Sequence, residues 1–349
     1  MDLSKIFLKN ACPTSIGGQA VMEGIMMRGP ERMAVACRLP DGTIHMKTQP
    51  NKKMGKWAKV PLLRGVVAFV SSLVEGTKTL MYSADVLEAN WPEEDQEEPG
   101  KFETWLNTKF GEKGAWNLMI YFSVVLALLM TIGIFILLPT VAANWLDAYI
   151  QSDILLNLLE GIFRIAIFII YIALISRMSD IKTVFQYHGA EHKTIHCFEN
   201  NLELTPANAQ QFYTLHPRCG TSFLMFVMVI SLILFSLLGW PNLFWRIVSR
   251  LLLIPVVAGL SYELLKWAGR SDNWLVKILS MPGLYLQKLT TNEPDDKQLE
   301  VAIAAMKAVM VPVETPYFEG ICDLDGNLVE AKTFERKSKA ETRRMAEES

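Results

Sequence analysis

The feature that most constrains this chain is an uncharged run of 29 residues, from Asn117 to Trp145. About 20 predominantly apolar residues are enough to cross the hydrocarbon core of a bilayer as a helix. Uncharged runs of this length rarely serve as buried helices of soluble proteins. The run therefore predicts a transmembrane helix and places the chain among the helical membrane proteins.

Three further apolar stretches are long enough to cross a bilayer: Leu155–Ser176, Thr221–Trp240 and Ile247–Leu265. Two of them contain charges, among them Glu160 and Arg164, which are four residues apart and can pair on one helix face. We therefore predict an α-helical polytopic membrane protein with about four transmembrane helices, formed by residues 117–265. A cytoplasmic, His-rich loop, 177–220, would separate the second helix from the third.

The sequence before this domain predicts a small β-rich segment over residues 1–59. Ala20–Arg28 and Met33–Leu39 are strand-like runs, and Asp41-Gly42 predicts a turn into a strand at Thr43–Thr48. Residues 60–90 have apolar positions at helical spacing and predict an amphipathic, interfacial helix. A fifth membrane span at 60–83 is the less favoured alternative, because this stretch contains three charges.

Residues 91–115 begin with the acidic sequence WPEEDQEEPG and are predicted to be a linker. After the membrane domain, residues 266–311 predict an interfacial helix with a turn at Pro282-Gly283, and a soluble helix from Glu293 to Met310. Residues 312–349 predict a hairpin around Asp325-Gly326, followed by a charged, disordered tail.

The distribution of Lys and Arg predicts the orientation in the membrane. The link between the first two spans, residues 139–153, has neither, whereas the 177–220 loop and the segment after the fourth span have several. Both termini and the 177–220 loop should therefore be cytoplasmic. The formal net charge of −2 provides no basic field for nucleic acid, so we expect no nucleic-acid partner. Five cysteines spread along the chain do not predict a disulfide framework.

The strongest chemical signal lies in the 177–220 loop, which holds four of the five histidines. Asp180 is positioned to cap a helix over 181–198, and on that helix His188 and His192 lie one turn apart on one face. Glu191 completes the pattern His-x-x-Glu-His, in which two imidazoles hold a metal ion and the carboxylate acts on its water. We predict zinc, because imidazole and thiolate ligands favour it over magnesium and calcium.

A third ligand must come from elsewhere in the chain. His196 lies roughly 12 Å along the helix axis from His188, so one straight helix cannot bring all three imidazoles to one ion. His216 and Cys219 can fold back beside His188 and are the preferred candidates. Glu23 and Glu263 are more distant ones. The alternative is a polar loop whose histidines only form hydrogen bonds.

Four motifs resemble the YqhQ-like family of bacterial membrane proteins, a domain of unknown function usually described as a predicted metal-dependent enzyme. They are GGQAVMEGIMMRGP (Gly17–Pro30), YHGAEHK (Tyr187–Lys193), HPRCGTSF (His216–Phe223) and PGLYLQKLTTNEPDD (Pro282–Asp296). The resemblance implies a multipass protein of the bacterial inner (plasma) membrane. The family's motif positions fall on Glu23, Arg28, His188, Glu191, His192, His216, Arg218 and Cys219.

Three functions compete. The first is a metal-dependent hydrolase at the cytoplasmic membrane face, with Glu191 as general base and Arg28 or Arg218 holding an anionic head group of a lipid or membrane peptide. The second is a non-enzymatic membrane factor with a structural His/Cys cluster, which would assist another membrane protein such as the protein-export channel. Four filled protein ligands would favour this second function. A transporter with Glu160, Arg164, Arg250 and Glu263 along its path is the least favoured.

Overall fold

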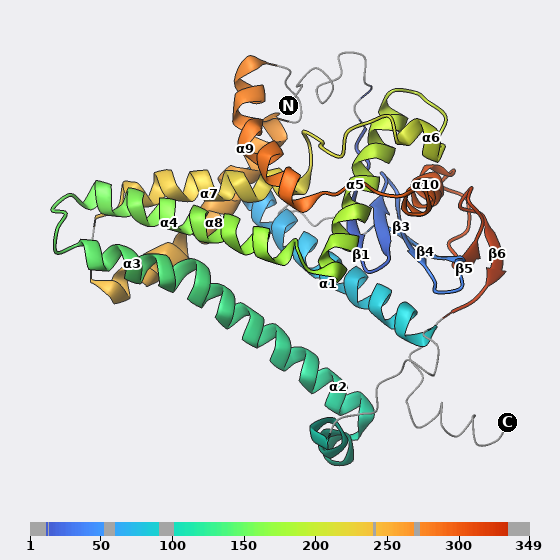
Figure 1. Cartoon of the computed structure of the whole chain (residues 1–349), viewed down its shortest axis with the longest axis horizontal. Coiled ribbons are helices and arrows are strands. Elements are labelled where there is room, and N and C mark those ends of the chain that lie inside the picture. Colours follow the sequence, from blue (N-terminus) through green and yellow to red (C-terminus); the bar gives the residue numbers. More distant parts are fainter. Residues whose placement is uncertain are drawn as a thin grey trace.

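The computed structural model describes residues 12, 14–51, 60–90, 101–239, 242–268 and 273–333. It consists of a helical bundle and, beside it, a β-sheet with helices on both faces (Figure 1). Most of the predicted tail after Lys332 and the start of the predicted linker, residues 91–100, lie outside the described residues.

Each of the four apolar stretches of the predicted membrane domain forms a helix over most of its described residues. Its elements are α2 (Lys101–Ile132), the π-helical turn η4 (Gly133–Leu137), α3 (Leu138–Leu146), α4 (Asp153–Ile175), α7 (Gly220–Ser236) and α8 (Leu243–Ala268). Within the described residues, three helices are long and apolar enough to cross a membrane: Tyr121–Leu146, Asp153–Ile175 and Leu243–Ala268. The fourth predicted span, α7, is an apolar helix of 17 residues.

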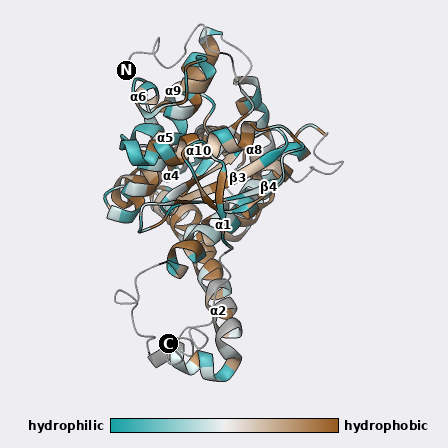
Figure 2. Ribbon diagram, turned by 90° about the vertical axis from the view of Figure 1, so that its right-hand side faces the viewer, coloured by the Kyte–Doolittle hydropathy of each residue, from teal (hydrophilic) through white to brown (hydrophobic). Residues whose placement is uncertain are grey.

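The outer surface of these helices is apolar. Large side chains such as Leu129, Ile170 and Leu252 are more than half exposed. In Figure 2, α2 changes from hydrophilic colours near its first residues to hydrophobic ones further along. Exposed apolar surface of this extent is expected where lipid replaces water as the solvent, so the helices are consistent with a membrane protein.

A buried ionic cluster joins the helices of the bundle. Glu160 pairs with Arg164 at 2.8 Å, as predicted from their spacing, and with Arg250 of α8 at 2.6 Å. Thr140 of α3 donates to Glu160, and Arg164 donates to the carbonyl oxygen of Phe135 in the π-helical turn. Three of the four charges that could have lined a transport path, Glu160, Arg164 and Arg250, are therefore bonded to one another, as buried charges must be.

The sheet is a six-stranded antiparallel meander in the order β1-β2-β3-β4-β5-β6. The N-terminal part supplies β1 (Gly17–Val21), β2 (Gly24–Arg28), β3 (Arg32–Arg38) and β4 (Ile44–Pro50), and the C-terminal part supplies β5 (Glu319–Cys322) and β6 (Leu328–Ala331). The N-terminal β unit and the C-terminal hairpin are thus confirmed. The hairpin pairs with β4, with Ile44 opposite Cys322.

Both faces of the sheet are covered. The first face buries Ile25, Met27 and Ala36 against α5 (Ser179–Glu199) and α10 (Asp296–Met310). The opposite face buries Val21, Met26 and Val35 beside Tyr82 of α1 (Leu63–Ala89). Side chains alternate along each strand, so neighbouring residues reach opposite layers. The predicted soluble helix is α10, which begins with a capping box at Asp295 and Gln298.

The structure corrects four local predictions. Ala20–Arg28 is not one strand, because a tight turn at Met22-Glu23 separates β1 from β2 and Glu23 has a φ of 46°. Helix α9 (Trp274–Thr290) continues through Pro282 without the predicted turn. Helix α2 begins at Lys101, inside the predicted linker. Helix α5 begins one residue after Met178, so Asp180 lies in its first turn and not at its cap.

Candidate metal centre

Helix α5 carries one apolar face and one imidazole-bearing face. Tyr187, Ala190 and Ile195 pack into the core against the sheet. His188, His192 and His196 follow at four-residue intervals and are directed toward the segment that precedes α7. A Cβ at Gly189 would lie 2.1 Å from the carbonyl oxygen of Asn292, so glycine lets α5 lie against the segment that follows α9.

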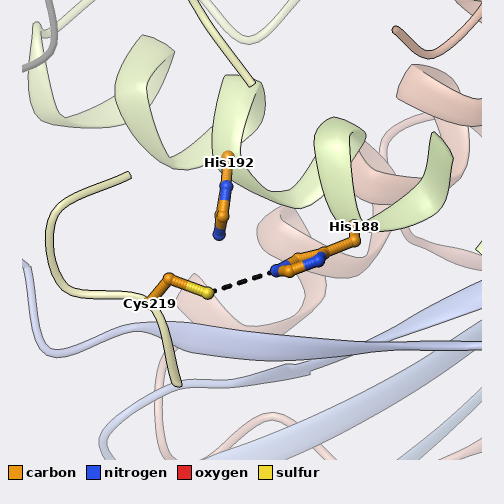
Figure 3. Close-up of side chains that lie close together, drawn as sticks. All are labelled: His188, His192 and Cys219. Carbon is orange, nitrogen blue, oxygen red and sulfur yellow. Dashed lines mark hydrogen bonds between the residues drawn. The ribbon is translucent and has the colours of Figure 1, made fainter. Parts of the chain in front are cut away.

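His188, His192 and Cys219 form one buried group, in which each residue offers a ligand atom within 4.8 Å of the others. Their side chains converge from α5 and from the start of α7 (Figure 3). The Nε2 of His188 is 3.2 Å from the Sγ of Cys219. Cys219 is the N-cap of α7, which fixes its backbone beside α5. The predicted pair His188 and His192 is therefore joined by Cys219.

Backbone carbonyls orient both imidazole rings. The Nδ1 of His188 is 2.8 Å from the carbonyl oxygen of Thr290, and the Nδ1 of His192 is 2.5 Å from that of Thr214. Each Nδ1 can thus donate its proton and leave Nε2 as the free ligand atom, the usual arrangement of metal-binding histidines. The buried Nε2 of His192 has no hydrogen-bond partner among the described residues. These donors fit a zinc ion, which takes imidazole and thiolate ligands.

The pKa values of His188 and Cys219 are both shifted strongly from their ordinary values. Burial disfavours the charge on His188, but Cys219 and Glu191 outweigh it and raise its pKa to about 9. Burial likewise disfavours the Cys219 thiolate, yet the two imidazoles hold its pKa well below the ordinary value. The thiolate is the form of cysteine that binds a transition metal, and a bound metal ion would take the place of the proton that His188 shares with Cys219.

Glu191 is buried beside this group without belonging to it. Its Oε1 accepts a 2.7 Å hydrogen bond from the backbone N–H of Gly18 in β1. Burial raises the pKa of its carboxyl group. Glu191, His188 and Cys219 line a cleft of about 570 Å³ between β1, α1, α5 and the start of α7. The carboxylate is thus placed where it could act on a molecule in the cleft.

A second buried group contains His196, Glu199 and His216. Here Arg218 donates to both carboxylate oxygens of Glu199, and Thr14 N–H donates to one of them. The guanidinium neutralises the carboxylate and lies where it would repel a metal cation. Burial, together with the positive charges of His192 and Arg218, holds the pKa of His216 well below its ordinary value. Of the two groups, the one that contains Cys219 is therefore the better candidate for a metal site.

The structure separates the other predicted site residues. Arg28 lines the cleft, whereas Arg218 is bound to Glu199. Glu23 is exposed in the β1–β2 turn and does not line the cleft. Glu263 pairs with Arg64 and joins α8 to α1. Neither Glu23 nor Glu263 belongs to a group that could hold a metal.

Sequence reasoning missed several residues that shape the site. Glu199 follows His196 by three residues, so helical spacing could have placed the two together. The carbonyl groups of Thr214 and Thr290 give no signal in side-chain chemistry, since any residue supplies a carbonyl oxygen. Gly18 lies inside the first family motif but offers no side chain as a signal, although its N–H holds Glu191.

The fold and the site define a class: a protein with a bundle of long apolar helices, a β-sheet unit beside it, and a buried His/His/Cys group formed by α5 and the start of α7. The chain belongs to the family described as "Protein of unknown function (DUF1385)", whose model matches residues 60–311. It is 36% identical over 310 residues to "Uncharacterized protein YqhQ" of Bacillus subtilis (strain 168). The aligned region covers 86% of this chain and 94% of the relative. No solved structure matches the chain. The resemblance inferred from the four motifs is thereby confirmed.

Proposed function

We propose that the protein is a zinc-dependent hydrolase of the bacterial inner membrane, whose site faces the cytoplasm and acts on a lipid or a membrane peptide. One observation carries the proposal. The group of residues that could hold a metal ion has three members, His188, His192 and Cys219, and it opens on a cleft that Glu191 also lines. Catalytic zinc sites use three protein ligands and keep a fourth position for water or substrate, whereas structural sites fill all four.

In this proposal each residue has a separate task. His188, His192 and Cys219 hold the zinc ion, which when bound supplies Lewis-acid activation of water and of a carbonyl or phosphoryl oxygen. Gly18 N–H fixes Oε1 of Glu191. No described residue donates to Oε2, which is left to accept the proton of the attacking water and return it to the leaving group. The carbonyls of Thr214 and Thr290 keep both rings oriented.

The test begins with elemental analysis of the full-length protein, purified in mild detergent. We expect about one zinc per chain in the wild type and in Glu191→Gln, and its loss in His192→Ala. His45→Ala is the matched control, because His45 is buried in the sheet domain and belongs to neither group. Glu191→Gln should abolish hydrolysis in a screen of bacterial lipids and membrane peptides. Wild-type protein without stoichiometric zinc, and without uptake of added zinc, would contradict the proposal.

One observation favours a second candidate, a thiol-dependent enzyme without a metal. His188 Nε2 and Cys219 Sγ are 3.2 Å apart, and Cys219 caps the N-terminus of α7, the arrangement of a Cys–His nucleophile pair. Metal-free protein whose Cys219 is alkylated far faster than buried Cys197 would support it. Zinc-loaded protein without any hydrolysis, in which His192→Ala only lowers stability, would instead support the membrane-factor alternative.

A further inference from the structure

Arg28 is a cation in the cleft, which Glu75 and Glu191 also line. No described residue forms a hydrogen bond or ion pair with its guanidinium, although the side chain is partly buried. Partly burying a charge is costly unless a partner compensates it. Arg218, the other arginine of the motifs, already has its carboxylate in Glu199. Arg28 is therefore the arginine that remains available to a ligand.

The strand register places Arg28 on the α1 side of the cleft, which also reaches α5 on the other face of the sheet. It follows Met26 by two residues in β2, so both side chains point to the face covered by α1. Its cross-strand partner is Gly17, where an added Cβ would meet no atom within 4 Å. Glycine opposite arginine thus leaves open space above β1 for the group that the guanidinium binds.

The remaining walls of the cleft favour an amphiphile. Met26, Met33, Val184 and Phe185 contribute apolar surface, and α1 contributes Ser72, Glu75 and Gly76. On α1 the adjacent side chains of Val70, Leu73 and Val74 are about half exposed. The cleft also touches the first turn of the apolar helix α7. The end of a membrane-crossing helix lies at the depth of the lipid phosphates, so the cleft opens at that depth if α7 crosses the bilayer.

We infer that Arg28 is the anion subsite of this cleft and that its ligand is a phosphate-bearing lipid. That this lipid is also the substrate of the hydrolase rests on the proposed function. Arginine binds phosphate through two parallel N–H donors, which gives orientation as well as affinity. The phosphate at Arg28 then sets the position of the lipid relative to Glu191, His188 and Cys219, which line the same cleft.

The test is calorimetric titration of the full-length protein in neutral detergent with dihexanoyl phosphatidate. Dihexanoyl glycerol, which lacks the phosphate, and inorganic phosphate are the two comparison ligands. We expect phosphatidate to bind more tightly than either. Arg28→Gln should weaken its binding about 10- to 100-fold, since hydrogen bonds to charged groups are the stronger ones. Arg28→Lys should recover part of the lost affinity for phosphatidate, which would show that the protein still folds with a substitution at this position.

The matched control is Arg177→Gln, which removes the same charge from an exposed position outside the cleft. It should leave phosphatidate binding unchanged. Equal affinity of Arg28→Gln and wild type for phosphatidate would overturn the inference, as would tighter binding of inorganic phosphate or of dihexanoyl glycerol than of phosphatidate. Zinc content separates the two proposals: Arg28→Gln should retain zinc, and a zinc-free protein that binds phosphatidate through Arg28 would refute the hydrolase but keep the subsite.

Discussion

Replacing Gly189 by alanine tests whether the approach of α5 to the segment after α9 builds the metal centre. In a helix interior, alanine is favoured over glycine by about 1 kcal/mol. Against this, the new Cβ would lie 2.1 Å from the Asn292 carbonyl oxygen and 3.1 Å from Thr214 Cγ2, whereas ordinary contacts begin at 3.4 Å. The two segments must therefore separate by more than 1 Å.

The magnitude follows from what that separation disrupts. Overpacking costs about 1–3 kcal/mol. The hydrogen bonds from Asn292 N–H to Phe185 and between His188 and the Thr290 carbonyl join the same two segments, and each contributes about 1 kcal/mol. After subtraction of the helix-propensity gain, we expect Gly189→Ala to destabilise the fold by about 2–4 kcal/mol. Loss of the Thr290 contact should also weaken zinc binding about 10- to 100-fold.

The assay is chemical unfolding in mild detergent, followed by tryptophan fluorescence, together with competitive zinc titration. Gly220→Ala is the control, because Gly220 begins α7 and an added Cβ there meets no atom within 4 Å. Its free energy of unfolding should be unchanged or up to about 1 kcal/mol higher. The reasoning would be refuted if Gly189→Ala were as stable as Gly220→Ala and bound zinc equally well.

Three further predictions concern other parts of the chain. Burial lowers the pKa of His45 below 6.5, although its Nε2 bonds the Lys332 carbonyl. The free energy of unfolding should therefore decrease as the pH falls below 6.5, and this decrease should be smaller in His45→Gln when unfolding is measured over a pH series. Arg218→Gln should destabilise the protein by about 1–3 kcal/mol because it leaves Glu199 buried with one fewer charged partner, and a double-mutant cycle with Glu199→Gln should show coupling between them. A cysteine placed at Asp147 should react with a membrane-impermeant reagent only from outside the cell; labelling from the cytoplasm would contradict the predicted orientation.

The parts that sequence could predict are those with local causes. Helix geometry alone brings His188 and His192 onto one face, and the four-residue spacing of Glu160 and Arg164 already implies their ion pair. The choice of Cys219 over His216 depends on the path of the chain between α5 and α7, which no local pattern specifies. Arg28 and Arg218 are equivalent as residue types, and only the position of Glu199 distinguishes them.

The remaining differences also have physical causes. The β1–β2 turn is formed by Met22 and Glu23, which are not typical turn residues, and only Gly24 after them hints at it. Proline usually ends a helix, but packing of α9 against α7 maintains the helix around Pro282. The hairpin at the C-terminal end was predicted locally, whereas its pairing with β4 is a contact between residues far apart in the sequence.

That pairing has a consequence for membrane topology. Strand β4 precedes every helix of the bundle and strand β5 follows all of them, so a continuous sheet requires both to lie on one side of the bilayer. Helix α5, between α4 and α7, packs on the same sheet and must share that side. A chain that leaves a compartment and returns to it crosses the membrane an even number of times. If α8 crosses, α7 must cross as well, even though its 17 residues give a length of only about 25 Å. The sheet therefore acts as a parity constraint that hydropathy alone, which finds three long spans, cannot supply.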